Sequence, residues 1–216
     1  MLPKSITKEF DELEQIVTQL HFNWQVYESL FLKNEDRIKL LNYTAPAFFI
    51  VVQIALIKDI LISIIQLTDK HKTKSNKNLT LDALIELLSE TDFLLKTTLN
   101  DLKSKLLDKT RAISIIRNKR LSHFDYKTFL DSGNIRKIIF NKESVIDSLA
   151  LISQFMNEIR YFYIGQHIIT LYSENISIGS VEHLIGWLKS GVKFEEAIST
   201  GKINDIHLYK DKFPKA

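Results

Sequence analysis

The residue types best suited to chemistry lie in one short stretch of the chain, from Arg117 to Asp125. The apolar residues before this stretch follow helical spacing. At 100° of rotation per residue, Arg117 and Arg120 fall within the same sector as the apolar Ile113. A guanidinium buried without a partner carries a large desolvation cost, so these arginines require a carboxylate, a phosphate ligand or a route to solvent.

The charge around this stretch favours a phosphate ligand. The chain of 216 residues has a net charge of only +3, but that charge is unevenly distributed. Eight Lys or Arg and three Asp lie between Asp101 and Lys127, which gives this segment a net charge of +5. A second basic cluster lies in a predicted loop and consists of Lys70, Lys72, Lys74 and Lys77. Positive fields of this kind attract phosphates, although a solvated helix face is the commoner explanation of a charge run.

His123 is the titratable partner in the stretch. It follows Arg117 by six residues, about 120° around a straight helix, so the two side chains would not face each other within one regular helix. They can converge if the helix ends near Ser122, or if a second copy of the chain brings its own pair alongside. Lys119 and Arg120 lie on the same side of the helix as the histidine.

The segment Arg117-Asn118-Lys119-Arg120-Leu121-Ser122-His123 resembles the signature of the HEPN superfamily of helical domains. That signature is an arginine followed by a polar residue, often Asn, with a histidine after about four to six intervening residues. The continuation Phe124-Asp125 looks like the abortive-infection (AbiU-like) branch, as do Leu67-Thr68-Asp69 and Asn78-Leu79-Thr80-Leu81 upstream. The resemblance covers roughly the first 170 residues and leaves the tail unmatched.

The resemblance implies a metal-independent endoribonuclease of toxin or phage-defence type, which acts as a homodimer on RNA beside a protein antitoxin. Cleavage by a neighbouring 2′-OH needs a base, an acid and cations for the developing charge. By the resemblance, His123 would transfer protons, Arg117 would clamp the phosphate and Asn118 would orient either partner. The residues implied to bind the RNA are Lys119, Arg120 and Asp125.

Two alternatives remain open. The first is a non-catalytic HEPN-like module that binds RNA or a protein partner, and the second is a purely structural helical dimer. In either case Arg117 would pair with a core carboxylate such as Asp59 or Asp69, and His123 would serve a helix C-terminus. No His, Asp or Glu spacing in the chain suggests a metal site, and no cofactor is expected.

The composition predicts an all-α fold. Three Pro and six Gly in 216 residues, and apolar stripes with steps of three and four, favour a bundle of about five main helices. We predict that bundle over residues 1–175 and a small helical appendage over 176–216, where most of the glycines lie. Thr80 is predicted to cap one helix and Asp108 another, and a long helix is predicted to run from Lys142 to Tyr172.

One segment, Ala45 to Leu67, is apolar enough to suggest a membrane span. Lys58 and Asp59 near its middle would each cost about 2.5–3.5 kcal/mol in a bilayer, so we predict a buried central helix instead. The chain has no Cys, and its first residues lack the apolar region of a secretory signal, so we predict a cytoplasmic protein. Trp24 and the Tyr161-Phe162-Tyr163 cluster are predicted to lie in the core.

Overall fold

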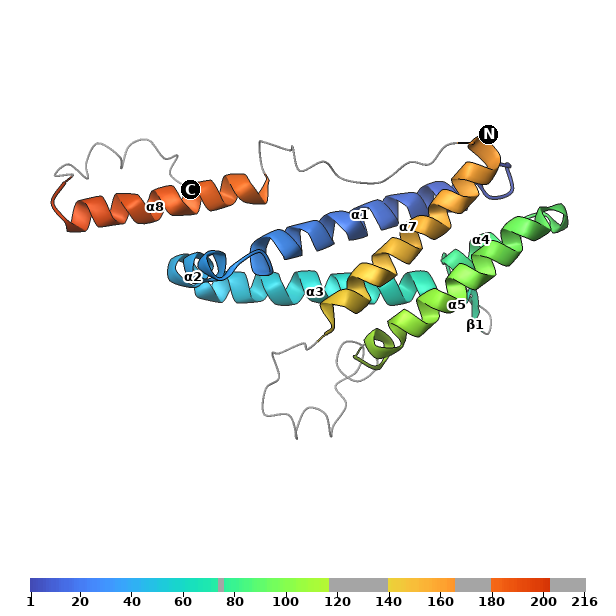
Figure 1. Ribbon diagram of the computed structural model, residues 1–216, viewed down its shortest axis with the longest axis horizontal. Coiled ribbons are helices and arrows are strands. Elements are labelled where there is room, and N and C mark those ends of the chain that lie inside the picture. The colour runs from blue at the N-terminus through green and yellow to red at the C-terminus, as the bar shows by residue number, and fades with distance from the viewer. Residues whose placement is uncertain (74–75, 117–139, 166–179, 203–216) are drawn as a thin grey trace. The chain divides into compact units, whose positions relative to one another are not determined.

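The computed structural model describes residues 1–73, 76–116, 140–165 and 180–202, and 82% of these residues are helical. The predicted all-α class is confirmed, since the described residues form seven α-helices and only one two-stranded hairpin. In chain order the elements are α1 (Thr7–Phe31), α2 (Glu35–Thr44), α3 (Pro46–Thr68), β1 (Lys72–Thr73), β2 (Asn76–Lys77), α4 (Leu81–Leu87), η1 (Glu90–Asp92), α5 (Phe93–Ile116), α7 (Lys142–Ile164) and α8 (Val181–Ser199) (Figure 1).

Local signals in the sequence set several helix ends. The Thr80 side chain accepts a hydrogen bond from the backbone N–H of Ala83, which confirms the predicted N-cap of α4. Asn34 ends the apolar stripe of α1 and caps α2 in the same way, by accepting from the N–H of Arg37. Pro46 opens α3, where its fixed φ and missing N–H are tolerated.

Two predicted helix ends are wrong. α5 is one continuous helix, so Asp108 does not cap a new one: it lies on the exposed side while Leu106 and Thr110 continue the buried stripe. α7 ends at Ile164 rather than Tyr172. Gly165 terminates it with φ of 73°, a left-handed conformation that glycine adopts without steric cost.

The chain divides into two compact units, which are described separately. The first contains residues 1–27 and 52–172, and the second contains residues 28–51 and 173–216. The predicted boundary between a bundle over 1–175 and an appendage over 176–216 stays a prediction.

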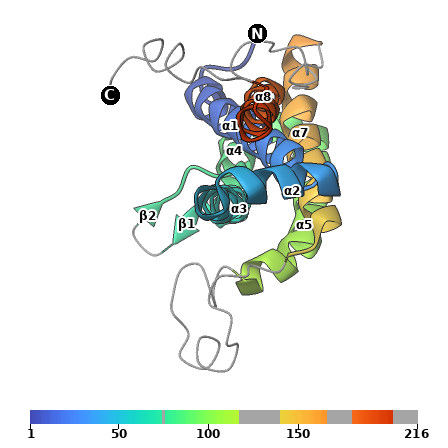
Figure 2. The same cartoon turned by 90° about the vertical axis from the view of Figure 1, so that its left-hand side faces the viewer.

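In the first unit, α5 and α7 lie side by side (Figures 1 and 2). Each helix buries a continuous stripe; α5 contributes Leu95, Leu99, Leu102, Leu106, Thr110 and Ile113, and α7 contributes Val145, Ser148, Leu149, Ile152, Phe155, Met156 and Ile159. The buried residues of α1 include Phe10, Leu13 and Trp24. The core prediction is therefore confirmed for Trp24 but is wrong for Tyr161 and Phe162, which are about half exposed at the end of α7.

In the second unit, α8 packs against α2. The buried guanidinium of Arg37 forms a bidentate ion pair with Glu182, with nitrogen–oxygen distances of 3.0 and 2.9 Å. Ile185 is buried, whereas Trp187 is exposed and donates to His183 on the preceding turn of the same helix. Trp187 therefore does not anchor α8 in the core of this unit.

α3 is the one described helix that is long and apolar enough to cross a membrane, by length and composition alone. Its second half includes the buried Ile60, Leu61 and Ile64, while Phe48 and Val51 in its first half are 60% and 65% exposed. Only 33% of its most apolar window is buried, so the prediction that α3 is a fully buried central helix is wrong for its first half.

Candidate functional site

The predicted site residues Arg117, Asn118, Lys119, Arg120, His123 and Asp125 lie outside the described residues, so their roles stay predictions. The structure does describe where the chain enters and leaves the segment that carries them. Both ends belong to the first unit.

The chain enters the segment from α5. The last buried residues of this helix are Thr110 and Ile113, and the helix ends at Ile116, immediately before Arg117. The ammonium of Lys109 lies 2.7 Å from the carboxylate of Asp147, which ties this end of α5 to the start of α7. The pKa of Lys109 is raised, chiefly because Asp147 accepts its hydrogen bond. α5 and α7 therefore fix the position from which the motif starts.

The chain leaves the segment at Phe140. The Phe140 ring contacts Trp24 edge-on with centroids 6.4 Å apart, and Tyr27 with centroids 5.9 Å apart. Asn141 then caps α7 by accepting from the N–H of Glu143. Aromatic packing on α1 and a helix cap thus anchor the second end of the segment.

Ion pairs change the interpretation of the basic stretch. Lys103, Lys105 and Lys109 pair with Asp82, Asp101 and Asp147 respectively. Because Asp82 and Asp147 come from outside the stretch, they offset the excess of two positive charges that residues 101–116 carry by themselves. By sequence, residues 117–127 carry a further net charge of +3, from four Lys or Arg and one Asp. The described ion pairs therefore offset the positive charge of α5, and the rest of the basic stretch lies outside the described residues.

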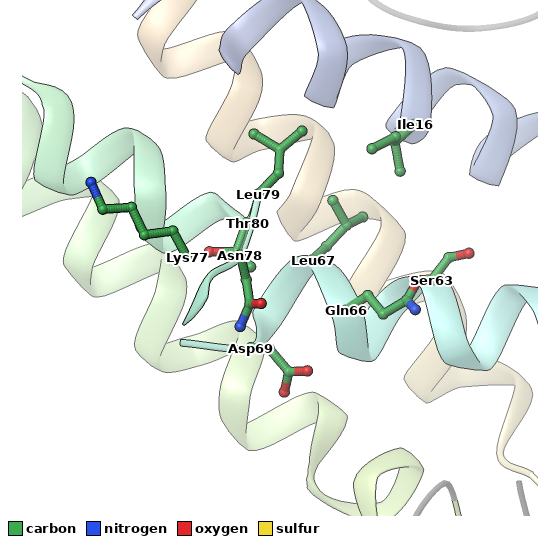
Figure 3. Close-up of a pocket in the computed structure, with 9 residues that line it drawn as sticks. All are labelled: Ile16, Ser63, Gln66, Leu67, Asp69, Lys77, Asn78, Leu79 and Thr80. Carbon is green, nitrogen blue, oxygen red and sulfur yellow. The ribbon is translucent and has the colours of Figure 1, made fainter. Parts of the chain in front are cut away.

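A pocket of about 450 Å³ opens in the first unit, between the end of α3, the hairpin and α1 (Figure 3). Its lining residues come from three separate segments: Ile16, then Ser63, Gln66, Leu67 and Asp69, then Lys77, Asn78, Leu79 and Thr80. Both upstream stretches on which the family resemblance rests, Leu67 to Asp69 and Asn78 to Leu81, contribute to this lining.

A network of hydrogen bonds holds the hairpin in place beside the pocket. Asn78 donates its backbone N–H to the His71 carbonyl at 2.7 Å and its amide to the Lys70 carbonyl at 3.0 Å. The backbone N–H of His71 donates to Asp82 at 3.1 Å, and Lys103 of α5 donates to the same carboxylate. Burial opposes ionisation of Asp82, but the bonds from Lys103 and His71 prevail and lower its pKa.

Sequence reasoning missed the pocket. Ile16 lies off the buried stripe of α1, and Ile16 and Leu79 are each 40% exposed. Apolar residues outside a helical stripe were the sequence signal that could have indicated the pocket. Gln66 and Ser63 gave none, because polar residues near a helix end are usually solvated.

Other titratable clusters in the described part of the chain are structural. Ser153 on α7 lies 2.6 Å from His21 on α1, and burial lowers the pKa of this histidine. Burial, and then the hydrogen bond that its hydroxyl donates to Asp92, raise the pKa of Tyr163. Within the described ranges no group of three or more His, Asp or Glu side chains is arranged to hold a metal ion.

Comparison with known proteins gives one match. The family model HEPN_AbiU2, described as AbiU2, matches residues 3–181, which include every described element from α1 to α7. No curated protein matches the sequence, and no solved structure does.

Proposed function

The chain belongs to the AbiU2 family of HEPN domains, and from that premise we propose that it is a metal-independent endoribonuclease of toxin or phage-defence type. The observation that carries the proposal is the net charge of +3 that residues 117–127 have by sequence, directly after α5, whose own excess of positive charge is offset by ion pairs. An RNA backbone would meet that charge beside Arg117 and His123, the two residue types the reaction needs.

The proposed reaction is an attack by the 2′-OH of the RNA on its own adjacent phosphate. His123 transfers a proton in this step, since an imidazole titrates near neutral pH. Arg117 binds the phosphate through two parallel N–H donors and stabilises the charge that develops on the phosphorane. Asn118 orients one of these groups, while Lys119, Arg120 and Asp125 contact the RNA. The bond to the 5′-oxygen breaks and a 2′,3′-cyclic phosphate remains.

The proposal includes a homodimer. Leu107 and Ile115 are 45% and 52% exposed, and eight residues of helix separate them by about 80° of rotation. With Arg111 between them, they form an exposed strip on α5 that leads toward the motif. A second copy of the chain would bury this strip and bring its own Arg117 and His123 to the same place. The antitoxin partner and the cytoplasmic location remain part of the proposal.

The test is cleavage of labelled single-stranded RNA, with and without excess EDTA. We expect cleavage to persist in EDTA, DNA to remain intact, and His123→Ala and Arg117→Ala each to slow cleavage by at least about 10²-fold. Lys58→Ala is the control for the loss of a cation, because Lys58 is exposed on α3, lies outside the proposed dimer strip and forms no ion pair with any described residue. Its rate should stay within about threefold of wild type.

Two results would contradict the proposal. Unchanged cleavage in His123→Ala would mean that the site lies elsewhere. Wild-type protein that binds RNA but cuts none of it, across several sequences and pH values, would establish instead the non-catalytic HEPN-like module.

A further inference from the structure

The pocket beside the hairpin has a chemical character that the proposed reaction does not use. We propose that it is a nucleotide-binding subsite, which holds one unpaired base of an RNA while Lys77 contacts the adjoining phosphate. The identification of the nucleotide as part of an RNA substrate rests on the proposed function.

The size and walls of the pocket fit a flat, partly apolar group. Its volume of about 450 Å³ lies within the range of about 300–1,000 Å³ that is usual for small-ligand sites. Ile16 and Leu79 offer half-exposed aliphatic surface, and Leu67 lies between them in Figure 3. A nucleobase would cover this apolar surface and remove it from water.

The polar side of the pocket has unused hydrogen-bonding groups. In the described part of the chain, the side chains of Gln66 and Ser63 form no hydrogen bond, although both line the pocket. An amide both donates and accepts, so Gln66 can pair with the polar edge of a base. The Asn78 amide, by contrast, is already bonded to Lys70 and Thr73 and holds the hairpin.

The direction of the Lys77 side chain indicates that the phosphate of a bound nucleotide would lie outside the pocket and the base inside it. Lys77 extends from the hairpin away from Ile16 and Gln66 (Figure 3), and no described carboxylate forms an ion pair with it. Its ammonium is therefore available to a phosphate that lies outside the pocket, next to a base held inside it.

Lys72, on the other strand of the same hairpin, differs from Lys77 because it forms an ion pair with Glu86. Lys77 occupies the other strand, opposite Lys72 in the pairing register. Lys77, which lines the pocket, therefore has no described carboxylate partner, whereas Lys72, which does not line it, has one.

The experiment measures binding of a fluorescein-labelled single-stranded RNA to full-length protein that carries His123→Ala, the change expected to slow cleavage by at least about 10²-fold. We expect Lys77→Ala to weaken binding by about fivefold to tenfold and to reduce the slope of log affinity against log salt by about 0.7, the value for one phosphate contact on a single strand. Gln66→Ala should weaken binding by about fivefold with the salt slope unchanged. Circular dichroism checks that each variant is folded.

The controls are Lys58→Ala on α3 and Gln154→Ala on α7, two exposed residues of the same types in the same unit. Both should bind the RNA within about twofold of the parent. Equal affinities for the parent, Lys77→Ala and Gln66→Ala would overturn the subsite.

A second arm separates RNA from free nucleotides as the source of the base. Millimolar mononucleotides should compete only weakly with the labelled RNA, and the RNA should compete with them at the pocket. If mononucleotides bind in the pocket while the affinity for RNA does not depend on the pocket residues, the proposal is overturned.

The two proposals can fail separately. If wild type cuts no RNA but Lys77→Ala still weakens RNA binding, the ribonuclease proposal is refuted and the subsite proposal stands. If wild type cuts RNA and the pocket variants cut it with unchanged KM, the subsite alone fails.

Discussion

Replacing Glu182 with Gln should loosen α8, because this side chain is the partner of a buried guanidinium. Arg37 is 7% exposed and donates to the Ser29 carbonyl at 2.6 Å as well as to both carboxylate oxygens of Glu182. The amide of Gln keeps one acceptor but turns a second donor toward the guanidinium. One of the two bonds from Arg37 to residue 182 is lost, and the remaining one no longer has a charged acceptor; the bond to the Ser29 carbonyl is unchanged.

The expected loss is about 1–2 kcal/mol. A hydrogen bond to a charged group contributes about 1.5–3 kcal/mol net, but exposed ion pairs contribute about 0–1 kcal/mol. Glu182 lies between these cases, since its own side chain is 55% exposed while that of Arg37 is buried. The matched control is Lys33→Met, which removes the exposed second partner of Glu182 at 2.8 Å and should cost less than about 0.5 kcal/mol.

The assay is amide hydrogen exchange of α8, followed by mass spectrometry. A loss of one to two kcal/mol corresponds to roughly 5–30-fold faster exchange in Glu182→Gln. Hydrogen bonds from Arg37, and then from Lys33, lower the pKa of Glu182 from 4.5 to about 2. Since the folded form has the lower pKa, its contribution is complete above about pH 4.5 and is lost as the pH falls toward 2. Exchange that is unchanged in Glu182→Gln, or equally fast in Lys33→Met, would refute this account of the ion pair.

Three further predictions concern the fold. Burial lowers the pKa of His21, so stability should be complete above the unfolded value of 6.5 and fall as the pH drops below it. His21→Gln should flatten this decline in urea midpoints measured at pH 7.5 and 5.5. Gly165→Ala should lower the free energy of unfolding by about 1–2 kcal/mol, because Gly165 has φ of 73°. Gly186→Ala, within α8, should raise it by about 0.5–1 kcal/mol; nothing lies within 4 Å of the added Cβ at either position, so the two differ only in backbone conformation. Equal effects of the two substitutions in urea titrations would contradict this backbone argument. Removal of residues 176–216 should leave the cooperative thermal melt of α5 and α7 in place, because their stripes bury each other; a melt without cooperativity would mean that the tail is part of the core.

Helices whose ends depend on neighbouring residues were predictable from the sequence. Pro46 opens α3 and Thr80 caps α4 by local chemistry that any chain with those residues would share. Asp108 misled the prediction for the same reason, because an aspartate on the solvent side of a long helix looks like a cap when its burial is unknown. Gly165 marks the end of α7, but the apolar residues after it continue the helical pattern in the sequence, so the helix was predicted to be too long.

Exposure could not be predicted from composition. The first half of α3 is as apolar as the second, but Phe48 is exposed and Ile60 is fully buried, since burial depends on which elements pack nearby. The pocket could not be predicted for the same reason: Ile16 and Leu79 are 63 residues apart in the sequence, and only the fold brings both of them to the lining of one pocket. The charge balance of α5 likewise depends on Asp82 and Asp147, which the sequence alone could not assign to Lys103 and Lys109.

Asp82 gives the pocket and the motif a common support. Its carboxylate accepts from the backbone of His71 at the base of the hairpin and from Lys103 on α5. The hairpin that supplies Lys77 and Asn78 is therefore fastened to the helix whose last residue, Ile116, precedes Arg117. α5 is in turn packed along α7, so under both proposals a base held in the pocket would be attached to the helix that leads into the motif segment. An attachment of this kind would favour the proposed subsite, because binding at one point aids cleavage at another only if the reacting groups are held in a fixed arrangement.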